Sequence, residues 1–479
     1  MRFIFSTKTA TFPESVVPIV ITEEKETEVI KDGKGKKTLY VGIGKRTAMT
    51  HRKLVTLARQ VVDIAKKNKV KKIAVNFSDF RFAHLPIGDE ELASLFAQNC
   101  EMANFEFNIF KKRPKDGWNE VEEVLVLGAD EKVKRGLLKG KIIGEEINKS
   151  RALANTPGGD MTPKLLAEEA RKACKGTKIS VKILGKKEMK KLGMGAVLGV
   201  AQGSVEEPKF IILEYKGGGK EKPASPGASQ GGPIVLVGKG VTFDTGGLNL
   251  KPSNSILEMH MDMSGGAAVI HAVVLAARLK LKKNVVGLIP AVENMPSGSS
   301  YRPGDILRSM SGKTIEVLNT DAEGRVILAD ALTYAKKYNP RLVVDVATLT
   351  GAALVALGQR ASAILTKDKK LQDLFMRLGE ESGDYMWPLP LWDEYEEDIK
   401  GNFADVANIP PSGSGYGGAI NGATFLYQFV KDDKANGKAT YPWVHIDMAP
   451  RMTSVSGDHL AKGSAGAPIR FLVKLLEEF

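Results

Sequence analysis

The segment Asn319–Arg325 constrains this chain more than any other stretch, because it joins two different structural periodicities and carries three charged side chains. Residues 314–318 alternate as a β-strand does, and apolar side chains in residues 326–335 recur at helical spacing. The segment is therefore predicted to be a strand-to-helix turn, and in α/β sheets such turns lie at the edge where ligands bind. Asp321 and Glu323 would repel each other there unless a cation lay between them. The alternative is a helix N-terminus whose acidic first turn stabilises the helix dipole.

The length of 479 residues predicts two or three domains. Residues 1–150 alternate strand-like and helix-like runs and are predicted to form an accessory α/β domain. Residues 151–165, which include Asn155-Thr156-Pro157-Gly158-Gly159, are predicted to be a linker helix and turn before a second domain at 166–479. The elements expected in the first domain are strands at 38–43, 72–77 and 122–127 and helices at 54–65 and 90–97.

The second domain repeats the alternation of strands and helices, which predicts an α/β fold with a mostly parallel, twisted central sheet flanked by helices on both faces. Its expected strands are 180–184, 210–215, 234–237, 285–290, 314–318 and 342–346, and its expected helices are 163–173, 265–281 and 326–338. Residues 23–37 are predicted to be a hairpin or surface loop, and residues 216–232, rich in Gly, Ser, Pro and Lys, a flexible surface loop.

The composition is that of an ordinary globular protein in a reducing compartment. The first 20 residues lack the apolar core of a signal peptide, and no uninterrupted apolar run is long enough to span a bilayer. Two cysteines are too few for a disulfide framework or a cysteine-based zinc site. A cytoplasmic location without membrane association is therefore expected.

The net charge of +13 leaves three kinds of partner open: nucleic acid, an anionic surface or acidic substrates. About half of the positive excess lies before residue 150, where lysines gather at an expected helix end and turn, namely Lys66, Lys67, Lys69, Lys71 and Lys72. This placement favours a solvated lysine-rich surface, with DNA binding as a second hypothesis.

A glycine-rich segment, Gly238–Gly247, follows the expected strand at 234–237. It does not fit a phosphate-binding loop, because Lys239 is followed by Gly and not by Ser or Thr. The glycines instead favour tight turns that aim Lys239, Asp244 and Lys251 into one cleft.

Four carboxylates lie in loops that are expected to meet at one edge of the sheet: Asp244, Asp262, Asp321 and Glu323. Oxygen-rich ligation suits hard or borderline divalent ions, and four acids suggest two ions that share bridging carboxylates and activate water. No His-Glu-x-x-His is present, and His260 is expected to lie outside the ligand set. A lysine among the acids has two open roles, as a neutral amine ligand or as a charged group that polarises a substrate carbonyl.

These segments resemble the leucyl aminopeptidase family. The resemblance lies in Val237–Gly247, Glu293–Gly298, Tyr301–Asp305 and the signature heptapeptide Asn319–Arg325, and it continues through Ala347–Ala352 and Asn402–Asn408. It runs from about Asn155 to the end, whereas the first 150 residues match only in general organisation. It implies a cytoplasmic homohexamer that removes N-terminal residues from peptides with a free N-terminus, and it makes 166–479 the catalytic peptidase domain.

The resemblance also implies the ligand sets. Asp244, Asp321 with its backbone carbonyl, and Glu323 would hold one ion, and Lys239, Asp244, Asp262 and Glu323 the other, the ions being manganese or zinc, with magnesium as a third candidate. A metal-bridging water would be the nucleophile. Lys251 would polarise the scissile carbonyl, and Arg325 would hold a bicarbonate ion as general base. The substrate's α-amine would bind near Asp262.

For the side-chain pocket, the resemblance implies an apolar lining that prefers Leu or Met and discriminates weakly among apolar residues. The implied residues are Met259, Asn319, Ala322, Thr348, Leu349, Gly351, Ala449 and Met452. The chain departs from the family at Pro450-Arg451, where Gly and a small residue are usual, and conservatively at Val326. A noncatalytic scaffold of the same fold is disfavoured, because every catalytic position is filled.

Overall fold

The computed structural model describes residues 1–7, 15–31, 35–218, 231–432 and 437–479. The described chain divides into two compact units, the first made of Met1–Asn148 and Ser454–Gly463 and the second of Lys149–Thr453 and Ser464–Phe479. Residues 454–463 were expected in the second domain but pack with the first unit. Arg59 Nη1 donates to the carbonyl of Asp458 at 3.2 Å, and His459 Nδ1 lies 2.9 Å from Asp63 Oδ2. Such long-range contacts leave no local signal in the sequence.

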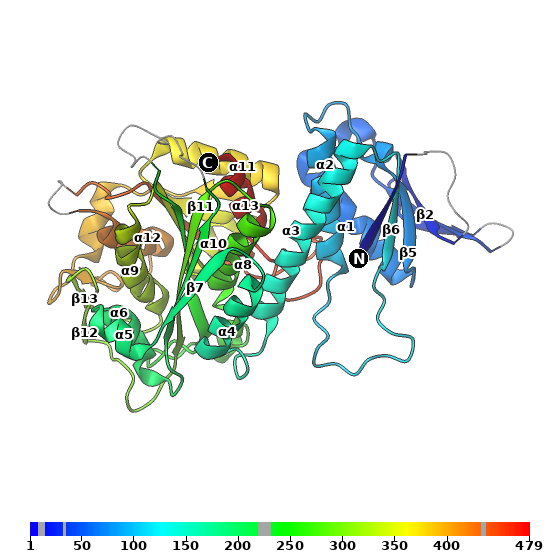
Figure 1. The fold of residues 1–479 in the computed structure, drawn as a ribbon. Coiled ribbons are helices and arrows are strands. Elements are labelled where there is room, and N and C mark those ends of the chain that lie inside the picture. Colours follow the sequence, from blue (N-terminus) through cyan, green and yellow to red (C-terminus); the bar gives the residue numbers. More distant parts are fainter. Residues whose placement is uncertain (8–14, 32–34, 219–230, 433–436) are drawn as a thin grey trace. The chain divides into compact units, whose positions relative to one another are not determined.

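The first unit is built on a six-stranded sheet in the order β1-β6-β5-β2-β4-β3 (Figure 1). Its described strand pairs are parallel except for the antiparallel pair β3–β4. The strands are β1 Arg2–Ser6, β2 Val17–Thr22, β3 Glu28–Lys31, β4 Lys37–Gly42, β5 Lys72–Asn76 and β6 Glu123–Leu127. The helices are η1 Arg46–Ala48, α1 His51–Lys67, η2 Phe77–Phe80, α2 Asp89–Asn104 and α3 Glu131–Asn155, the last of which continues into the second unit.

Helix α1 shows how the sequence specifies these elements. The Thr50 hydroxyl accepts a hydrogen bond from the Lys53 amide and caps the N-terminus, and Lys66 and Lys67 lie in the last turn, where they complement the helix dipole. The three strands and the helix expected at 54–65 are confirmed within a few residues, and the helix expected at 90–97 is confirmed but continues to Asn104. The expected hairpin is confirmed by the β3–β4 pairing, although residues 32–34 lie outside the described residues.

The second unit contains a nine-stranded sheet in the order β16-β15-β18-β14-β9-β11-β8-β7, with β10 paired to β11. Its centre, β18-β14-β9-β11, is parallel. The pairs β11–β8, β8–β7 and β18–β15 are antiparallel, and the edge strand β16 pairs with β15 in parallel. The strands are β7 Ile179–Leu184, β8 Lys209–Lys216, β9 Ile234–Gly238, β10 Gly240–Asp244, β11 Asn284–Asn294, β14 Leu342–Ala347, β15 Ser362–Leu365, β16 Met386–Pro388 and β18 Trp443–Asp447. Most of the loop expected at 216–232 lies outside the described residues.

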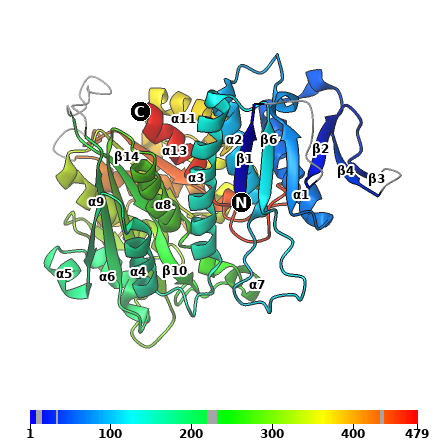
Figure 2. The same ribbon diagram turned by 45° about the vertical axis from the view of Figure 1, so that its right-hand side comes forward.

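Helices cover both faces of this sheet, as Figure 1 shows with the sheet nearly edge-on: α8, α4 and α13 lie on one face and α9, α6 and α12 on the other. Figure 2 shows α8 and α13, and α9 and α6, from a second direction. The helices are α4 Pro163–Cys174, α5 Lys186–Lys191, α6 Gly195–Val200, η3 Ala201–Gly203, α7 Ser253–Ile256, η4 Met259–Met261, α8 Ser264–Arg278, α9 Glu323–Ala335, η5 Lys336–Tyr338, α10 Gly351–Leu357, α11 Lys369–Ser382, η6 Asp393–Ile399, α12 Gly418–Val430, η8 Ala449–Arg451 and α13 Ile469–Glu478. The α/β architecture is confirmed.

The strand expected at 314–318 is shorter than predicted and lies outside the main sheet. It forms β13, Thr314–Glu316, in a three-stranded sheet with β12, Ile306–Arg308, and β17, Val406–Ala407. The backbone leaves the ladder after Glu316, because the amides of Leu318 and Asn319 donate to the Asn408 side chain instead. The turn into α9 is confirmed, but it does not start from the central sheet.

The stretch 259–278, which contains α8, is long and apolar enough to cross a membrane, although the sequence was expected to hold no such run. However, 89% of its most apolar window is buried inside the protein. Small residues at the start of α8, among them Gly265 and Gly266, let this helix lie directly against β9 and β14. The stretch is therefore the core helix of the second unit.

Candidate metal centre

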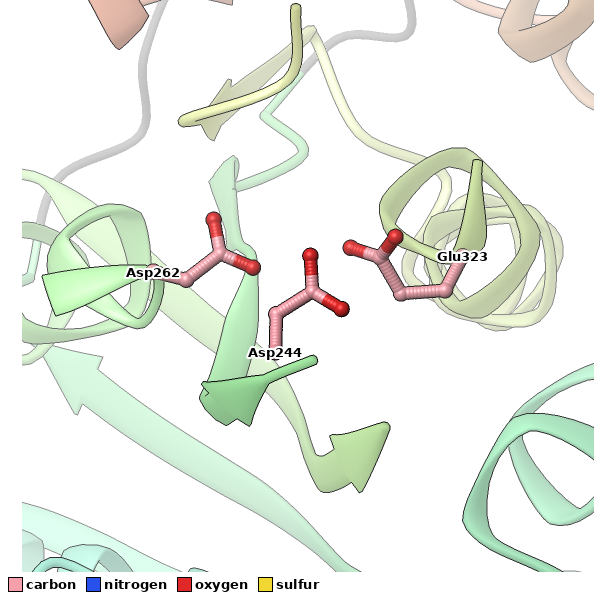
Figure 3. Close-up of side chains that lie close together, drawn as sticks. All are labelled: Asp244, Asp262 and Glu323. Atoms are coloured by element: carbon pink, nitrogen blue, oxygen red, sulfur yellow. The ribbon is translucent and has the colours of Figure 1, made fainter. Parts of the chain in front are cut away.

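Three buried carboxylates meet in the second unit: Asp244, Asp262 and Glu323. Each offers an oxygen atom, and these atoms all lie within 4.8 Å of one another. Figure 3 shows the three side chains pointing toward a common centre from three separate elements. Asp244 ends β10, Asp262 lies between η4 and α8, and Glu323 is the first residue of α9. The cluster thus combines segments far apart in the chain.

Asp244 is held by the end of β11 and by the turn that follows its own strand. Asn294 Nδ2 donates to Asp244 Oδ1 at 2.8 Å, and the Gly246 amide donates to the same oxygen at 2.9 Å. Asn294 also donates to the carbonyl of Thr320, which fixes the distance between β10 and the loop that carries Asp321. The second carboxylate oxygen of Asp244 remains directed at the site.

Lys239 lies at the inner end of the cluster. Its Nζ is 2.8 Å from both Asp262 Oδ2 and Glu323 Oε1, and it donates to the carbonyl of Thr348 at 3.0 Å. A Cβ on Gly324 would come within 2.8 Å of this Nζ and 2.7 Å of Lys239 Cε. Glycine at position 324 is therefore what lets the lysine lie against the start of α9.

Lys251 lies on the solvent side, with a side chain that is 15% exposed. Its Nζ is 2.9 Å from Asp244 Oδ2 and forms a second ion pair with Asp321. Asp321, the fourth expected ligand, is one-third exposed and lies outside the group of three, although it lines the same cavity. The structure therefore places Lys239 beside Asp262 and Glu323, and Lys251 beside Asp244 and Asp321.

The electrostatics favour a cation in the cluster. Burial first, and then the charge of Asp244, raises the pKa of Glu323 to about 8, and burial also raises the pKa of Asp262 to about 6. Burial alone would lower the pKa of Lys239 and of Lys251, but the neighbouring carboxylates outweigh it and raise both.

Two buried oxygens in the cluster, Asp262 Oδ2 and Glu323 Oε1, have Lys239 Nζ within ion-pair distance but no well-formed hydrogen bond from any described residue. Buried acceptors without donors are rare in folded proteins. These oxygens and the remaining carboxylates form a hard, anionic donor set, which fits divalent metal ions.

Arg325 follows in the first turn of α9 and is buried. Its Nη1 donates to the carbonyl of Asn408 at 2.9 Å, whereas its Nε has no partner among the described residues. Burial lowers the pKa of Arg325 to about 10, so the guanidinium stays charged at neutral pH. A buried cation with an unused donor is suited to binding a small anion.

A cavity of about 600 Å³ opens from the cluster. It is lined by both lysines, the four carboxylates and six of the expected pocket residues: Met259, Thr348, Leu349, Gly351, Ala449 and Met452. Pro252, Asn254, Ser255, Leu257, Glu258, Thr350 and Leu354 complete the wall. These seven were not predicted; the first five follow Lys251 directly in sequence, which is the signal that could have indicated them.

Several other expected residues do not line this cavity. Asn319 shapes the loop instead, because its Oδ1 accepts from the Asp321 amide at 2.7 Å, and Ala322 precedes α9 in a buried position. His260 lies outside the carboxylate cluster, as expected. In the departure at Pro450-Arg451, Pro450 is buried and Arg451 donates to the carbonyl of Gln359, so neither side chain reaches the cavity.

Asn408 was not predicted as a site residue, although it organises the signature segment. Its Oδ1 accepts from the amides of Leu318 and Asn319, its Nδ2 donates to the carbonyl of Asn319, and its own carbonyl accepts from Arg325. It is fully buried. A buried asparagine that satisfies a loop's backbone is recognisable only in the folded structure.

Comparison with protein families identifies both parts of the chain. Residues 148–473 match the catalytic domain of the cytosol aminopeptidase family, and residues 24–114 match the N-terminal domain of the same family. The catalytic match covers the metal cluster, both lysines, Arg325 and the cavity.

Individual relatives agree with this assignment. The chain is 40% identical to a probable cytosol aminopeptidase of Saccharophagus degradans over 93% of its length and 86% of that protein, and 45% identical to one of an Azoarcus species over 78% and 71%. Among solved structures, the bottromycin maturation enzyme BotP in complex with Mn superposes with a TM-score of 0.84 at 29% identity, covering 97% of this chain and 99% of that one. The chain thus belongs to the cytosol, or leucyl, aminopeptidase family and is an aminopeptidase, a metal-dependent peptide hydrolase.

Proposed function

We propose that this protein is a two-metal aminopeptidase that releases Leu, Met and other apolar residues from the N-terminus of peptides. The observation that supports this most is the buried group of Asp244, Asp262 and Glu323, with Lys239 and Lys251 beside it, in the wall of a cavity of about 600 Å³. Carboxylates in this arrangement suit two divalent ions that share ligands.

The ligand assignment is the one that the family resemblance implies. Asp244, Asp321 through side chain and carbonyl, and Glu323 would hold one ion; Lys239, Asp244, Asp262 and Glu323 would hold the other. Manganese and zinc are the leading candidates, with magnesium third. When bound, such ions polarise a carbonyl and activate water at neutral pH. Lys239 would bind as the neutral amine, since nearby cations oppose the effect of the carboxylates that now raise its pKa.

Lys251 is proposed to act on the substrate carbonyl. Its ammonium lies at the cavity, 2.9 Å from Asp244 Oδ2, and neighbouring acids keep it charged. From there it would donate to the oxygen of the scissile carbonyl and stabilise the negative charge that develops on it. Arg325 would hold bicarbonate as the group that accepts the proton of the attacking water, a role supported by its buried Nε without a partner.

The free α-amine of the substrate accounts for the proposed preference for a chain end. It would bind at the second ion near Asp262, which is buried at the cavity, and an internal peptide bond offers no such group. The first side chain would then rest against Met259, Leu349 and Met452, an apolar wall that favours Leu and Met by burial.

We also propose a cytoplasmic homohexamer, as the family resemblance implies. Sedimentation of the purified protein would give six times the 51.8 kDa chain mass if this is right, and a monomer mass would refute it.

The function is tested by hydrolysis of leucine p-nitroanilide after chelator treatment, with manganese, zinc or magnesium restored singly, with and without bicarbonate. We expect activity to return with metal and to increase with bicarbonate. The variant Glu323→Gln should lose at least about 100-fold in kcat/KM, because one bridging charge is removed. Glu293→Gln, a half-buried acid at the end of β11 that does not line the cavity, is the matched control. The absence of hydrolysis under every one of these conditions would refute the proposal.

A further inference from the structure

Asp447, the last residue of β18, holds two separate parts of the cavity wall together. Its Oδ1 accepts hydrogen bonds from the amides of Leu349 at 3.1 Å, Thr350 at 3.4 Å and Ala449 at 3.2 Å. Its Oδ2 accepts from the Thr350 hydroxyl at 2.6 Å. All three partners line the cavity, whereas Asp447 itself is fully buried behind them.

The two wall segments lie about a hundred residues apart in sequence. One is the loop from Thr348 into α10, and the other is the turn from Ala449 to Met452. At its other end the loop is attached to the metal cluster, because the Thr348 hydroxyl donates to Asp262 Oδ1 at 2.7 Å and its carbonyl accepts from Lys239. The loop is therefore fixed at one end by metal ligands and at the other by Asp447.

The hydrogen bonds to the Asp447 carboxylate come from the cavity wall. Arg325 and His445 also interact electrostatically with its charge. A buried carboxylate of this kind is stabilised by the amides and hydroxyl that point at it. The same hydrogen bonds hold the backbone of Leu349, Thr350 and Ala449 around one point, so removing the carboxylate takes away an acceptor that these three amides of the cavity wall share.

We propose that Asp447 is a positioning residue that sets the width of the cavity at the substrate's first side chain, and thereby the discrimination among apolar first residues. This inference rests on the proposed aminopeptidase specificity of the same cavity. Leu349 and Ala449 belong to the wall that the substrate side chain would touch, and Asp447 fixes their backbones relative to each other by accepting a hydrogen bond from each amide. Discrimination by one or two methylene groups requires a wall that does not move.

The experiment compares kcat/KM for the p-nitroanilides of Ala, Val, Leu and Met in the metal-loaded protein. Asp447→Ala should lower the ratio of Leu to Ala at least about tenfold, because the relaxed wall no longer fits the larger side chain. Asp447→Asn keeps one oxygen for the three amides and should stay within about threefold of the parent ratio. If Asp447→Ala does not fold, Thr350→Val removes the 2.6 Å hydrogen bond to Asp447, together with the cap that the Thr350 hydroxyl gives to the Ala353 amide of α10, and should shift the ratio in the same direction.

Asp384→Ala is the matched control. Asp384 is also buried in this unit and accepts hydrogen bonds from the amides of Arg470 and Phe471, but it does not line the cavity. Its loss should reduce stability and leave the substrate ratio unchanged. The ratio is independent of the fraction of active protein, so a purely structural role for Asp447 would not move it.

An unchanged ratio in Asp447→Ala and Thr350→Val, or an equal shift in Asp384→Ala, would overturn this inference while leaving the aminopeptidase proposal intact. A parent protein that hydrolyses none of the four substrates would instead overturn the proposed function.

Discussion

Gly324, in the signature segment, must lack a side chain for the metal cluster to keep its arrangement. In the second position of α9, alanine is intrinsically better than glycine by about 1 kcal/mol. Glycine is nonetheless needed, because the Lys239 side chain occupies the space that a Cβ would enter. Lys239 has little freedom to move, since it is buried and contacts Asp262, Glu323 and Thr348.

We therefore expect Gly324→Ala to displace Lys239 and lower both bound metal and kcat/KM by about tenfold or more, without loss of helix content. Metal analysis after dialysis, circular dichroism and leucine p-nitroanilide hydrolysis measure the three quantities. Gly159→Ala is the control, because nothing described lies within 4 Å of a Cβ added there. Full metal occupancy in Gly324→Ala would contradict this account of the glycine.

At the scale of elements, α9 serves the site and the core at once. Its first turn carries Glu323 and Arg325, and its middle carries Asp330, which is fully buried. Asp330 accepts from the amide of Val197 at 3.0 Å and of Met310 at 2.7 Å. It thereby attaches α6 and the end of β12 to α9, which holds the site-bearing turn against the small sheet of β12, β13 and β17.

Asp330 makes the stability of α9 depend on pH. Burial raises its pKa from 3.8 to about 7, against the opposing effect of hydrogen bonds from the amides of Met310, Val197 and Ala196. Between pH 3.8 and about 7 the folded protein holds a proton on Asp330 that the unfolded chain releases. The contribution of this proton to the free energy of unfolding is therefore present at acidic pH and is lost as the pH rises toward 7.

Urea unfolding of the parent and of Asp330→Asn at pH 5 and pH 8 tests this. We expect the parent's advantage in free energy of unfolding to be larger at pH 5, by on the order of 2–3 kcal/mol, because asparagine does not titrate. The other acids titrate in both proteins and cancel in the difference. A difference that is independent of pH would show that Asp330 is ionised throughout.

At the scale of the whole molecule, the metal cluster links binding to stability. Without cations, Asp262 and Glu323 keep raised pKa values and two buried oxygens lack donors among the described residues. Metal bound to the folded chain alone stabilises it by mass action, about 2.7 kcal/mol at one hundred times the dissociation constant.

We therefore expect manganese to raise the melting temperature of chelator-treated protein by several degrees, and to raise that of Glu323→Gln much less. Differential scanning fluorimetry without substrate measures this independently of activity. Equal shifts in both proteins would place the stabilising ion outside the cluster.

The net charge of +13 also acts at this scale. In the first unit, four of the lysines at the helix end and turn form ion pairs, Lys66 with Glu106, Lys67 with Asp63, Lys71 with Glu122 and Lys72 with Glu123. Part of the local positive charge is thus neutralised, which favours a solvated surface.

For DNA, we expect only weak binding at low salt, with an affinity that falls steeply and disappears near 0.2 M salt, as electrostatic phosphate contacts alone would produce. A gel-shift series against salt concentration measures the slope. Affinity that survives 0.2 M salt would instead establish DNA binding as a second function.

By itself the sequence determined the chemistry of the site. Asp244, Asp262, Glu323, Lys239 and Lys251 stand in turns beside strands or helices, and local periodicity suffices to place such turns. The α/β class followed from the same patterns, whereas the apolar pocket wall around Met259, Leu349 and Met452 was implied by the family resemblance alone.

Only the tertiary structure decided which groups act on one another. It moved the strand at 314–316 into a separate sheet, packed residues 454–463 with the first unit, and paired Asp321 with Lys251 at the edge of the cluster. It also placed Asp447 and Asn408 behind the residues they position. These relations depend on contacts between residues far apart in the chain, whereas periodicity, capping and turn chemistry report only on neighbours within a few residues.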